Sequence, residues 1–344
     1  SAGNSGNLND GTSGVWEGDF APASPPAALT GLDTHDFGGG ASLNTITQDT
    51  PFLFTLQWSD PLGGSGNDYD LILLDAAGTT IFDVGANTQN GDDNPYEFID
   101  SGAFNDTGNT LAVVRFSGDG RYLHVNTHRG RLAMATAGQT SGHACAAGAF
   151  GVAATDWFNT GPPAPAPFTG GPANPVEDFS SDGPRRVFFQ ADGTPITPGD
   201  FTSTGGQLRF KPDITAADGV STATPGFAQF FGTSAAAPHA AAISALVQQQ
   251  ANVTRAGLAS LFAAGALDIE AVGPDRDSGF GIVDALVSTG ATSPTSMTCY
   301  VDDLVLTGVP NDGPQTFRAC TSITTIDGTF VDVTGIAPTI AFDN

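Results

Sequence analysis

The stretch FFGTSAAAPHAAAISALV, residues 230–247, constrains the fold of this chain more than any other segment. Between residues 235 and 247 only one histidine and one serine are strongly polar. A run this apolar and this rich in alanine favours a buried helix over a strand. Because proline is tolerated only in the first turn of a helix, Pro238 predicts that the helix begins near Ser234.

Ser234 therefore lies where backbone N–H groups have no partner within the helix and where the helix dipole is positive. Two interpretations fit this position. Serine is among the commonest N-cap residues, and Gly-Thr before it is ordinary turn chemistry. Alternatively, Ser234 is a catalytic nucleophile whose oxyanion is held by the same helix N-terminus. The segment alone leaves both interpretations open.

The charge of the chain limits its partners. The 344 residues include 11 basic and 36 acidic ones, which gives a net charge of −25. This charge argues against nucleic acids and anionic membranes as partners. We expect no membrane insertion either, since no window reaches the roughly 18 consecutive apolar residues of a transmembrane helix. An acidic surface with Lys211 as the only lysine suits a secreted or salt-exposed protein.

The chain starts without an initiator methionine or a signal peptide. Its first residues, SAGNSGN, read like the end of a strand that enters a loop. We therefore expect the sequence to be a fragment or a processed product.

The three cysteines give two different expectations. Cys299 and Cys320 lie in the same polar tail and could pair as a disulfide in an oxidising compartment. Cys145 lies among alanines and is expected to be a small buried hydrophobic residue. No Cys/His spacing is typical of a zinc site.

The pattern of apolar residues divides the chain into regions. From residue 36 to 130, segments such as FLFTLQW and TLAVVRF alternate with period two between turn residues. This alternation predicts an antiparallel β-sandwich of five to eight strands, to which we assign residues 16–137. Residues 1–15 and 138–290 indicate an α/β core, with a second helix predicted in TRAGLASLFAAGALDI. Residues 291–344 form a β-rich C-terminal extension.

Five segments together resemble motifs of the subtilisin-like serine peptidases, the subtilases. GTSAAAPHAAA is similar to the nucleophile motif of that family, and SAGNSG to its oxyanion-hole motif. VEDFSSDGP and KPDITAADG resemble segments just upstream of the nucleophile, and DSGFGIVDA resembles the end of the catalytic domain. The resemblance covers residues 1–7 and about 138–288. It implies a subtilisin-like parallel-sheet core, incomplete at its N-terminus and interrupted by the sandwich, which resembles an insert of some secreted bacterial subtilases.

This resemblance implies a serine endopeptidase that hydrolyses protein or peptide substrates and needs no cofactor for catalysis. Ser234 would attack the peptide carbonyl, and its backbone N–H together with the Asn4 side-chain amide would hold the oxyanion. Ala2 and Gly3 are the implied substrate-binding residues. Because the insert leaves the core directly after this oxyanion loop, its two ends should lie close together.

The acid and the base of the family precede the oxyanion asparagine, and neither motif occurs in this chain. We expect an upstream part of the same polypeptide to carry this Asp and His, so that the chain is inactive alone. None of the five histidines is expected to act as the base. We predict His35 at a strand edge, His124 and His128 on the surface, His143 in a structural position, and His239 packed or capping within the helix.

Acidic residues offer a weak candidate for a metal site. In GSGNDYDLILLD the carboxylates of Asp68, Asp70 and Asp75 alternate with apolar residues, and such oxygen ligands suit a structural Ca²⁺ ion. A polar loop followed by an ordinary strand explains the same pattern. The segment DRDSG, residues 275–279, is expected to be a turn.

Two other functions fit the same sequence. The chain could be a non-catalytic binding or accessory fragment whose insert recognises protein or polymer. It could also be a pseudo-peptidase whose complete form has lost the base. The sequence upstream of Ser1 would distinguish these functions from the peptidase.

Overall fold

The computed structural model describes residues 1–50, 52–102, 104–160 and 168–288, together with the strand segments 301–306, 315–320, 322–324 and 330–332. The chain divides into two compact units, Ser1–Ala285 and Leu286–Asn344. The predicted sandwich and most of the predicted α/β core both lie in the first unit. Within the described part of the chain, no helix has the length and apolar character needed to cross a membrane.

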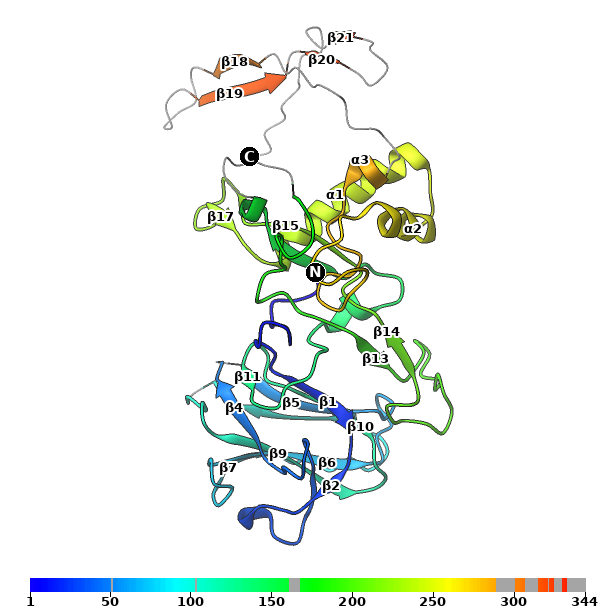
Figure 1. Cartoon of the computed structure of the whole chain (residues 1–344). Coiled ribbons are helices and arrows are strands. Elements are labelled where there is room, and N and C mark those ends of the chain that lie inside the picture. The colour runs from blue at the N-terminus through cyan, green and yellow to red at the C-terminus, as the bar shows by residue number, and fades with distance from the viewer. Residues whose placement is uncertain are drawn as a thin grey trace. The chain divides into compact units, whose positions relative to one another are not determined.

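Two antiparallel sheets occupy residues 15–132 (Figure 1). The first contains, in spatial order, β1 (Val15–Asp19), β10 (Tyr122–Asn126), β5 (Leu53–Trp58) and β8 (Tyr96–Asp100). The second has the order β11 (Arg131–Leu132), β4 (Asn44–Gln48), β9 (Thr110–Ser117), β3 (Asp33–His35) and β2 (Pro22–Ala23). It also contains β6 (Asp68–Leu74), which pairs with β9, and β7 (Ile81–Gly85), which pairs with β6, while η1 (Ala27–Leu29) is a short 3₁₀ helix.

The two sheets share one hydrophobic core. Leu56 of β5 and Leu123 of β10 come from the first sheet, and Leu71 of β6 and Val113 of β9 from the second; all four are fully buried. The described residues of this region form more strands than the five to eight predicted, because β2, β3 and β11 span only two or three residues. Such short strands carry no readable period-two pattern.

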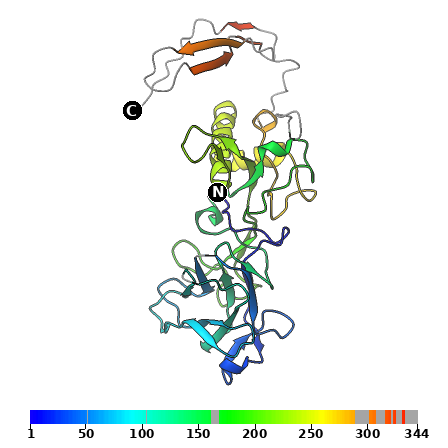
Figure 2. The same cartoon turned by 90° about the vertical axis from the view of Figure 1, so that its left-hand side faces the viewer.

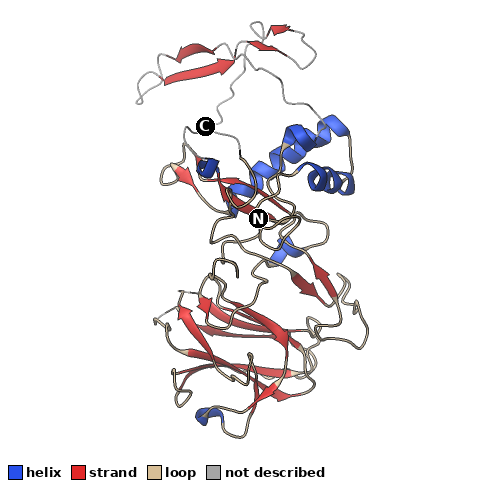
Figure 3. Ribbon diagram, viewed as in Figure 1, coloured by secondary structure: helices blue, strands red, loops and turns tan. Residues whose placement is uncertain are grey.

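A parallel pair of strands forms the centre of the α/β region. β12 (Val152–Asp156) pairs with β15 (Ile214–Asp218) in parallel. α1 (Thr233–Ala251) packs against this pair, as Figures 1 and 2 both show for β15, and α2 (Arg255–Gly265) contacts α1 and adds Leu258 and Phe262 to the same core. Ala216, Ala240 and Phe262 are buried in the shared core. Mixed β-structure with a few helices agrees with the predicted α/β class (Figure 3).

Short elements complete the described structure. The first unit contains two short 3₁₀ helices, η2 (Gly142–Cys145) and η3 (Trp157–Thr160). It also contains two antiparallel pairs of strands, β13 (Arg185–Val187) with β14 (Gln207–Arg209) and β16 (Val220–Ser221) with β17 (Gln229–Phe230). The short helix α3 (Ala285–Ser288) begins at the end of the first unit and continues into the second. The second unit contains β18 (Val301–Leu306) paired with β19 (Gln315–Cys320) and β20 (Ser322–Thr324) paired with β21 (Phe330–Asp332). Cys145 is buried and free, as predicted. The predicted disulfide lies outside the described residues, because Cys299 and the side chain of Cys320 are not among them.

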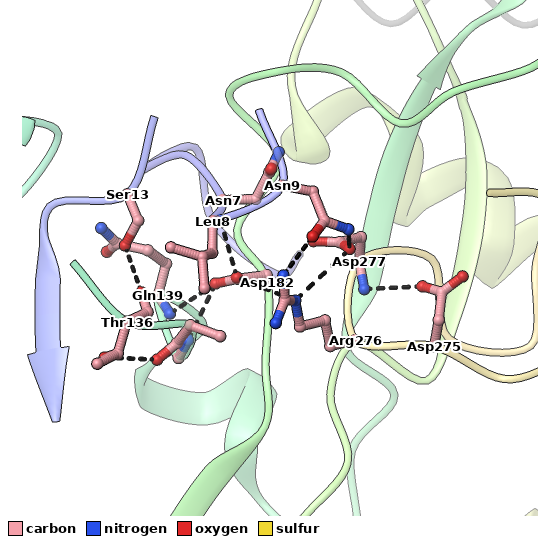
Figure 4. Close-up of polar contacts among 12 residues, drawn as sticks. Asn7, Leu8, Asn9, Ser13, Thr136, Gln139, Asp182, Asp275, Arg276 and Asp277 are labelled. Atoms are coloured by element: carbon pink, nitrogen blue, oxygen red, sulfur yellow. Dashed lines mark hydrogen bonds and ion pairs between the residues drawn. The ribbon is translucent and has the colours of Figure 1, made fainter. Parts of the chain in front are cut away.

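The two ends of the region predicted to be an insert lie side by side. The Thr136 N–H donates to the Val15 carbonyl at 2.8 Å, and the Ser13 hydroxyl donates to the Thr136 carbonyl at 2.7 Å. Figure 4 shows this contact next to Asp182, whose fully buried carboxylate accepts hydrogen bonds from the backbone N–H groups of Leu8 and Gln139. The N-terminal segment and the segment that follows the sandwich are thus attached to the same buried carboxylate.

Candidate active site

Ser234 is exposed at the start of α1. The helix begins at Thr233, as predicted to within one residue, and its N-cap is Gly232. Ser234 is therefore the second helical residue, and the N-cap interpretation of this serine is wrong. Its backbone N–H belongs to the first turn, where no carbonyl of the helix can accept it. The positive end of the helix dipole lies at the same place.

The position of Pro238 differs from the prediction. It is the sixth residue of α1 and thus lies in the second turn rather than the first. Its ring nitrogen has no hydrogen to donate to the Ser234 carbonyl four residues earlier. Because Ser234 and Pro238 are both exposed, water can hydrate that carbonyl.

Gly232 is required by the geometry at the start of the helix. Its φ of 122° lies in a region that other residues rarely adopt. Its N–H donates to the Asp218 carboxylate at 2.6 Å, which fixes the turn to the end of β15. A Cβ at this position would lie 2.9 Å from Nδ2 of Asn4, closer than a side chain can pack. The glycine of Gly-Thr-Ser therefore leaves room for Asn4.

Asn4 lies directly beside the first turn of α1. Its Oδ1 accepts hydrogen bonds from the Thr233 N–H at 3.0 Å and from the Thr233 hydroxyl at 2.7 Å. Because the oxygen of the Asn4 side-chain amide accepts both of these bonds, its Nδ2 group is the part of the amide that can donate a hydrogen bond. The position of a Cβ on Gly232 is 2.9 Å from Nδ2 of Asn4 and 3.7 Å from the backbone nitrogen of Ser234. The side-chain amide of Asn4 and the backbone N–H of Ser234, which are 230 positions apart in the sequence, therefore both lie close to this Cβ position.

Ala2 and Gly3 hold the N-terminal segment against the core. The Ala2 N–H donates to the Val152 carbonyl at 2.8 Å, and the Gly3 N–H donates to the Thr233 hydroxyl at 3.2 Å. The Gly3 carbonyl accepts from Ser181 at 3.0 Å. Both backbone polar groups of Gly3 are therefore used within the protein, and the substrate-binding role of the two residues stays a prediction.

None of the five histidines, all of which lie in the described part of the chain, forms a hydrogen bond with Ser234. On the same helix, Nδ1 of His239 bonds to the Ala217 carbonyl at 2.8 Å, which agrees with a packing role. His143 is exposed on η2. His35 ends β3 and is fully buried against Trp16, and this burial lowers its pKa to about 4.

The prediction that His124 lies on the surface is wrong. Its side chain is buried on the outer face of β10, because Arg185 of β13 covers it. Nδ1 of His124 also bonds to the Glu17 carboxylate at 2.7 Å, and Glu17 in turn pairs with Arg185. Burial and the Arg185 charge lower the pKa of His124 to about 4, so the ring is neutral at pH 7. His128 is half-buried, with Nε2 3.0 Å from the Thr55 hydroxyl.

Comparison with known proteins identifies the family. A family model described as the subtilase family matches residues 68–281, which is more than half of the chain. The chain belongs to the subtilase family. The match to this family of peptidases begins at the start of β6 rather than near residue 138, where the resemblance of the motifs resumes.

The solved structure of the Clostridium perfringens CspB protease is similar to this subtilase. The two sequences are 16% identical and the TM-score is 0.46. The alignment covers 84% of this chain and 58% of the other, so this subtilase spans a little more than half of that protein's length. No curated protein matches the chain.

The structure does not bring the predicted metal ligands of this subtilase together. Asp68 and Asp70 lie on β6, but the exposed Asp75 carboxylate accepts hydrogen bonds from the backbone and hydroxyl of Thr79 in the following turn. Among the described residues, these three aspartates form no group with metal-ligand spacing. Burial, the neighbouring Asp68 and the more distant Glu97 raise the pKa of Asp70 to about 6.

A different group of acidic residues has the spacing of metal ligands. One carboxylate oxygen each from Asp156, Glu177 and Asp218 lies within 4.8 Å of the others, and we call these three residues the carboxylate cluster. Sequence reasoning missed it. The signal was that Asp156 and Asp218 end two short apolar strands, at the edge where parallel sheets place functional groups.

Proposed function

We propose that this subtilase hydrolyses peptide bonds with Ser234 as the nucleophile and Asn4 as a donor to the oxyanion. The observation that carries the proposal is the contact of Asn4 with Thr233, the residue next to Ser234. This contact joins two motifs at opposite ends of the catalytic region. It also fixes the amide, because Oδ1 is held by two hydrogen bonds while Nδ2 remains the donor.

In this mechanism the Ser234 hydroxyl attacks the scissile carbonyl, and negative charge develops on the carbonyl oxygen. The Ser234 N–H and Asn4 Nδ2 donate hydrogen bonds to that oxygen. Both donors are positioned before the substrate binds, so they need no reorganisation when the charge forms. The N-terminal end of α1 adds the favourable potential of the helix dipole. Ala2 and Gly3 would line the adjoining substrate-binding strand.

The proposal needs a general base from outside the 344 residues. His239 lies on α1, but Nδ1 already bonds to the Ala217 carbonyl. His35 and His124 are buried in the sandwich region. We therefore propose that an upstream part of the same polypeptide supplies the Asp and His, and that the protein is secreted and acts on proteins or peptides. Its acidic, lysine-poor composition supports the secreted location.

We also propose that residues 16–137 are a β-sandwich insert in the subtilase core and that residues 291–344 are a C-terminal extension. The adjacent ends of the sandwich, joined through Val15 and Thr136, support the insert. Its own hydrophobic core, separate from the one beneath α1, supports it as well.

Kinetics of the protein extended by the upstream segment test the proposed chemistry. We expect Ser234→Ala to lower kcat/KM for a chromogenic peptide by at least about a thousandfold. Asn4→Ala should lower kcat by roughly a hundredfold to a thousandfold and change KM little, because its hydrogen bond strengthens in the transition state. Ser244→Ala is the matched control, since Ser244 lies on the same helix and bonds only to the Ala240 carbonyl.

Two results would contradict the proposal. One is full activity of the Ser234→Ala variant. The other is robust hydrolysis by the 344-residue chain alone, because that chain would then contain a base that the geometry does not place near Ser234.

A further inference from the structure

The carboxylate cluster lies at the carboxyl ends of the parallel strands. Asp156 ends β12 and Asp218 ends β15, and the two residues are partners in the register of the pair. The segment that carries Glu177 is attached to the same strand, because the Glu177 N–H donates to the Ala154 carbonyl at 2.8 Å. Three separate segments of the chain therefore bring one carboxylate each to a single place.

Asp218 shows that the cluster is more than a group of surface acids. Its side chain has no exposed surface. Oδ2 accepts the Gly232 N–H, whereas Oδ1 is buried without any hydrogen-bond partner. A buried carboxylate oxygen without a partner is costly, so its presence in a residue of the carboxylate cluster indicates a ligand.

The charges of the cluster are not balanced by the protein. No lysine, arginine or histidine of the described residues forms an ion pair with any of its members. Asp156 and Glu177 are half-buried, so an ion from solvent can reach the group. A cation bound here would compensate charges that otherwise repel one another at short range.

We propose that Asp156, Glu177 and Asp218 bind a Ca²⁺ ion. All three ligand atoms are carboxylate oxygens, which calcium prefers. Two ligand oxygens at about 2.4 Å from one Ca²⁺ ion can be at most about 4.8 Å apart, and the three oxygens of the cluster all lie within 4.8 Å of one another, so one ion can contact all three. Mg²⁺ usually keeps several of its waters and is bound by only one or two carboxylates, so a group of three carboxylates favours Ca²⁺.

The ion would act on the start of α1. Asp218 belongs to the cluster and also accepts the N–H of Gly232, two residues before Ser234. Calcium would therefore fix the turn that presents Ser234, and it would stabilise the folded chain by binding only to that state. The inference does not depend on peptidase activity, and it is tested on the 344-residue chain without substrate.

Terbium luminescence tests the inference directly, because Tb³⁺ replaces Ca²⁺ and is excited through a nearby tryptophan. Trp157 follows Asp156, and its indole N–H donates to the Gly219 carbonyl at 2.6 Å, beside Asp218. We expect saturable Tb³⁺ emission that Ca²⁺ displaces with a dissociation constant on the order of 10⁻⁵–10⁻³ M. Glu177→Gln should weaken Ca²⁺ binding at least tenfold by calorimetry, and Trp157→Phe should reduce the emission while calorimetric binding persists.

Asp70→Asn is the matched control, since it removes one charge from the other acidic group, on β6, and should leave Ca²⁺ binding unchanged. Because Glu177 is half-buried, its glutamine variant is expected to fold, and circular dichroism checks this. No saturable binding of either ion, or equal Ca²⁺ affinity in wild type and Glu177→Gln, would overturn the inference. Displacement of Tb³⁺ by an arginine peptide but not by Ca²⁺ would also overturn it and would assign the cluster to a basic side chain.

Discussion

At the scale of single residues, Asp277 is a buried carboxylate outside the site whose surroundings shift its pKa strongly. It is almost fully buried, accepts a hydrogen bond from the Asn9 amide, and leaves its other oxygen without a partner (Figure 4). Burial and the nearby Asp182 raise its pKa to about 7, although Arg276 acts in the opposite direction. Asp277 therefore keeps its proton in the folded protein at a pH where the unfolded chain has lost it.

This difference predicts how stability changes with pH. Between about pH 4 and pH 7 Asp277 holds up to one more proton in the native state than in the unfolded state, so its contribution to the free energy of unfolding falls as pH rises. Asp277→Asn removes this contribution and should make the slope of that free energy against pH more positive by up to about 1.4 kcal/mol per pH unit. Urea unfolding at several pH values measures the slope, and Asp92→Asn, an exposed position, is the control. The same slope in wild type and Asp277→Asn would contradict the assignment.

Single residues also differ in how far the sequence could predict their surroundings. Ser234 and Asn4 were predicted from local motifs, Gly-Thr-Ser and the asparagine loop, and the structure places Asn4 against Thr233, next to Ser234. The burial of His124 could not be found in this way. Alternation along β10 places His124 on the face away from the core, opposite to that of Leu123, and the residues that cover it there include Arg185, 61 residues later.

At the scale of elements, α1 depends on small residues where it meets the sheet. Ala236 and Ala240 are buried one turn apart in the core that contains β12 and β15. Their small size allows the helix to approach the strands closely, which places its N-terminus beside Asn4. The alanine-rich run predicted this helix. The carboxylate cluster was missed because it depends on the register between β12 and β15, which no local pattern records.

A pair of neighbouring alanines tests this packing. Ala240→Leu adds three carbon atoms to a filled core and should lower the free energy of unfolding by about 1–3 kcal/mol. Ala241→Leu adds the same atoms at an exposed position and should change it by less than about 0.5 kcal/mol. Guanidinium unfolding compares the two variants. Equal losses of stability would show that α1 does not pack on the strands through Ala240.

At the scale of the whole molecule, the sandwich and the α/β region belong to one compact unit but have separate cores. Besides the two junctions, the sandwich contacts the rest of the unit around β13. The Ser59 hydroxyl and the Tyr122 N–H both donate to the Phe201 carbonyl, and Glu17 pairs with Arg185 at 2.7 Å. An aromatic contact accompanies these polar ones, since the Tyr122 and Phe188 rings lie 5.5 Å apart.

Deleting residues 16–137 tests this organisation. With a short Gly/Ser linker between the ends, the protein extended by its upstream segment should stay folded and active on small peptides. Its melting temperature should fall, since Arg185 and Phe201 lose their partners. Circular dichroism and peptide hydrolysis measure both properties. Loss of soluble protein would show that the sandwich is part of the subtilase core.

The nucleophile itself is the most direct test of the whole account. A fluorophosphonate reacts covalently with an activated serine, and peptide mass spectrometry locates the adduct. In the protein extended by its upstream segment we expect the adduct on Ser234, no adduct in Ser234→Ala, and much slower labelling of the 344-residue chain, which lacks a base near that hydroxyl. An adduct on another residue with Ser234 unmodified, or equally fast labelling of the 344-residue chain, would contradict the account.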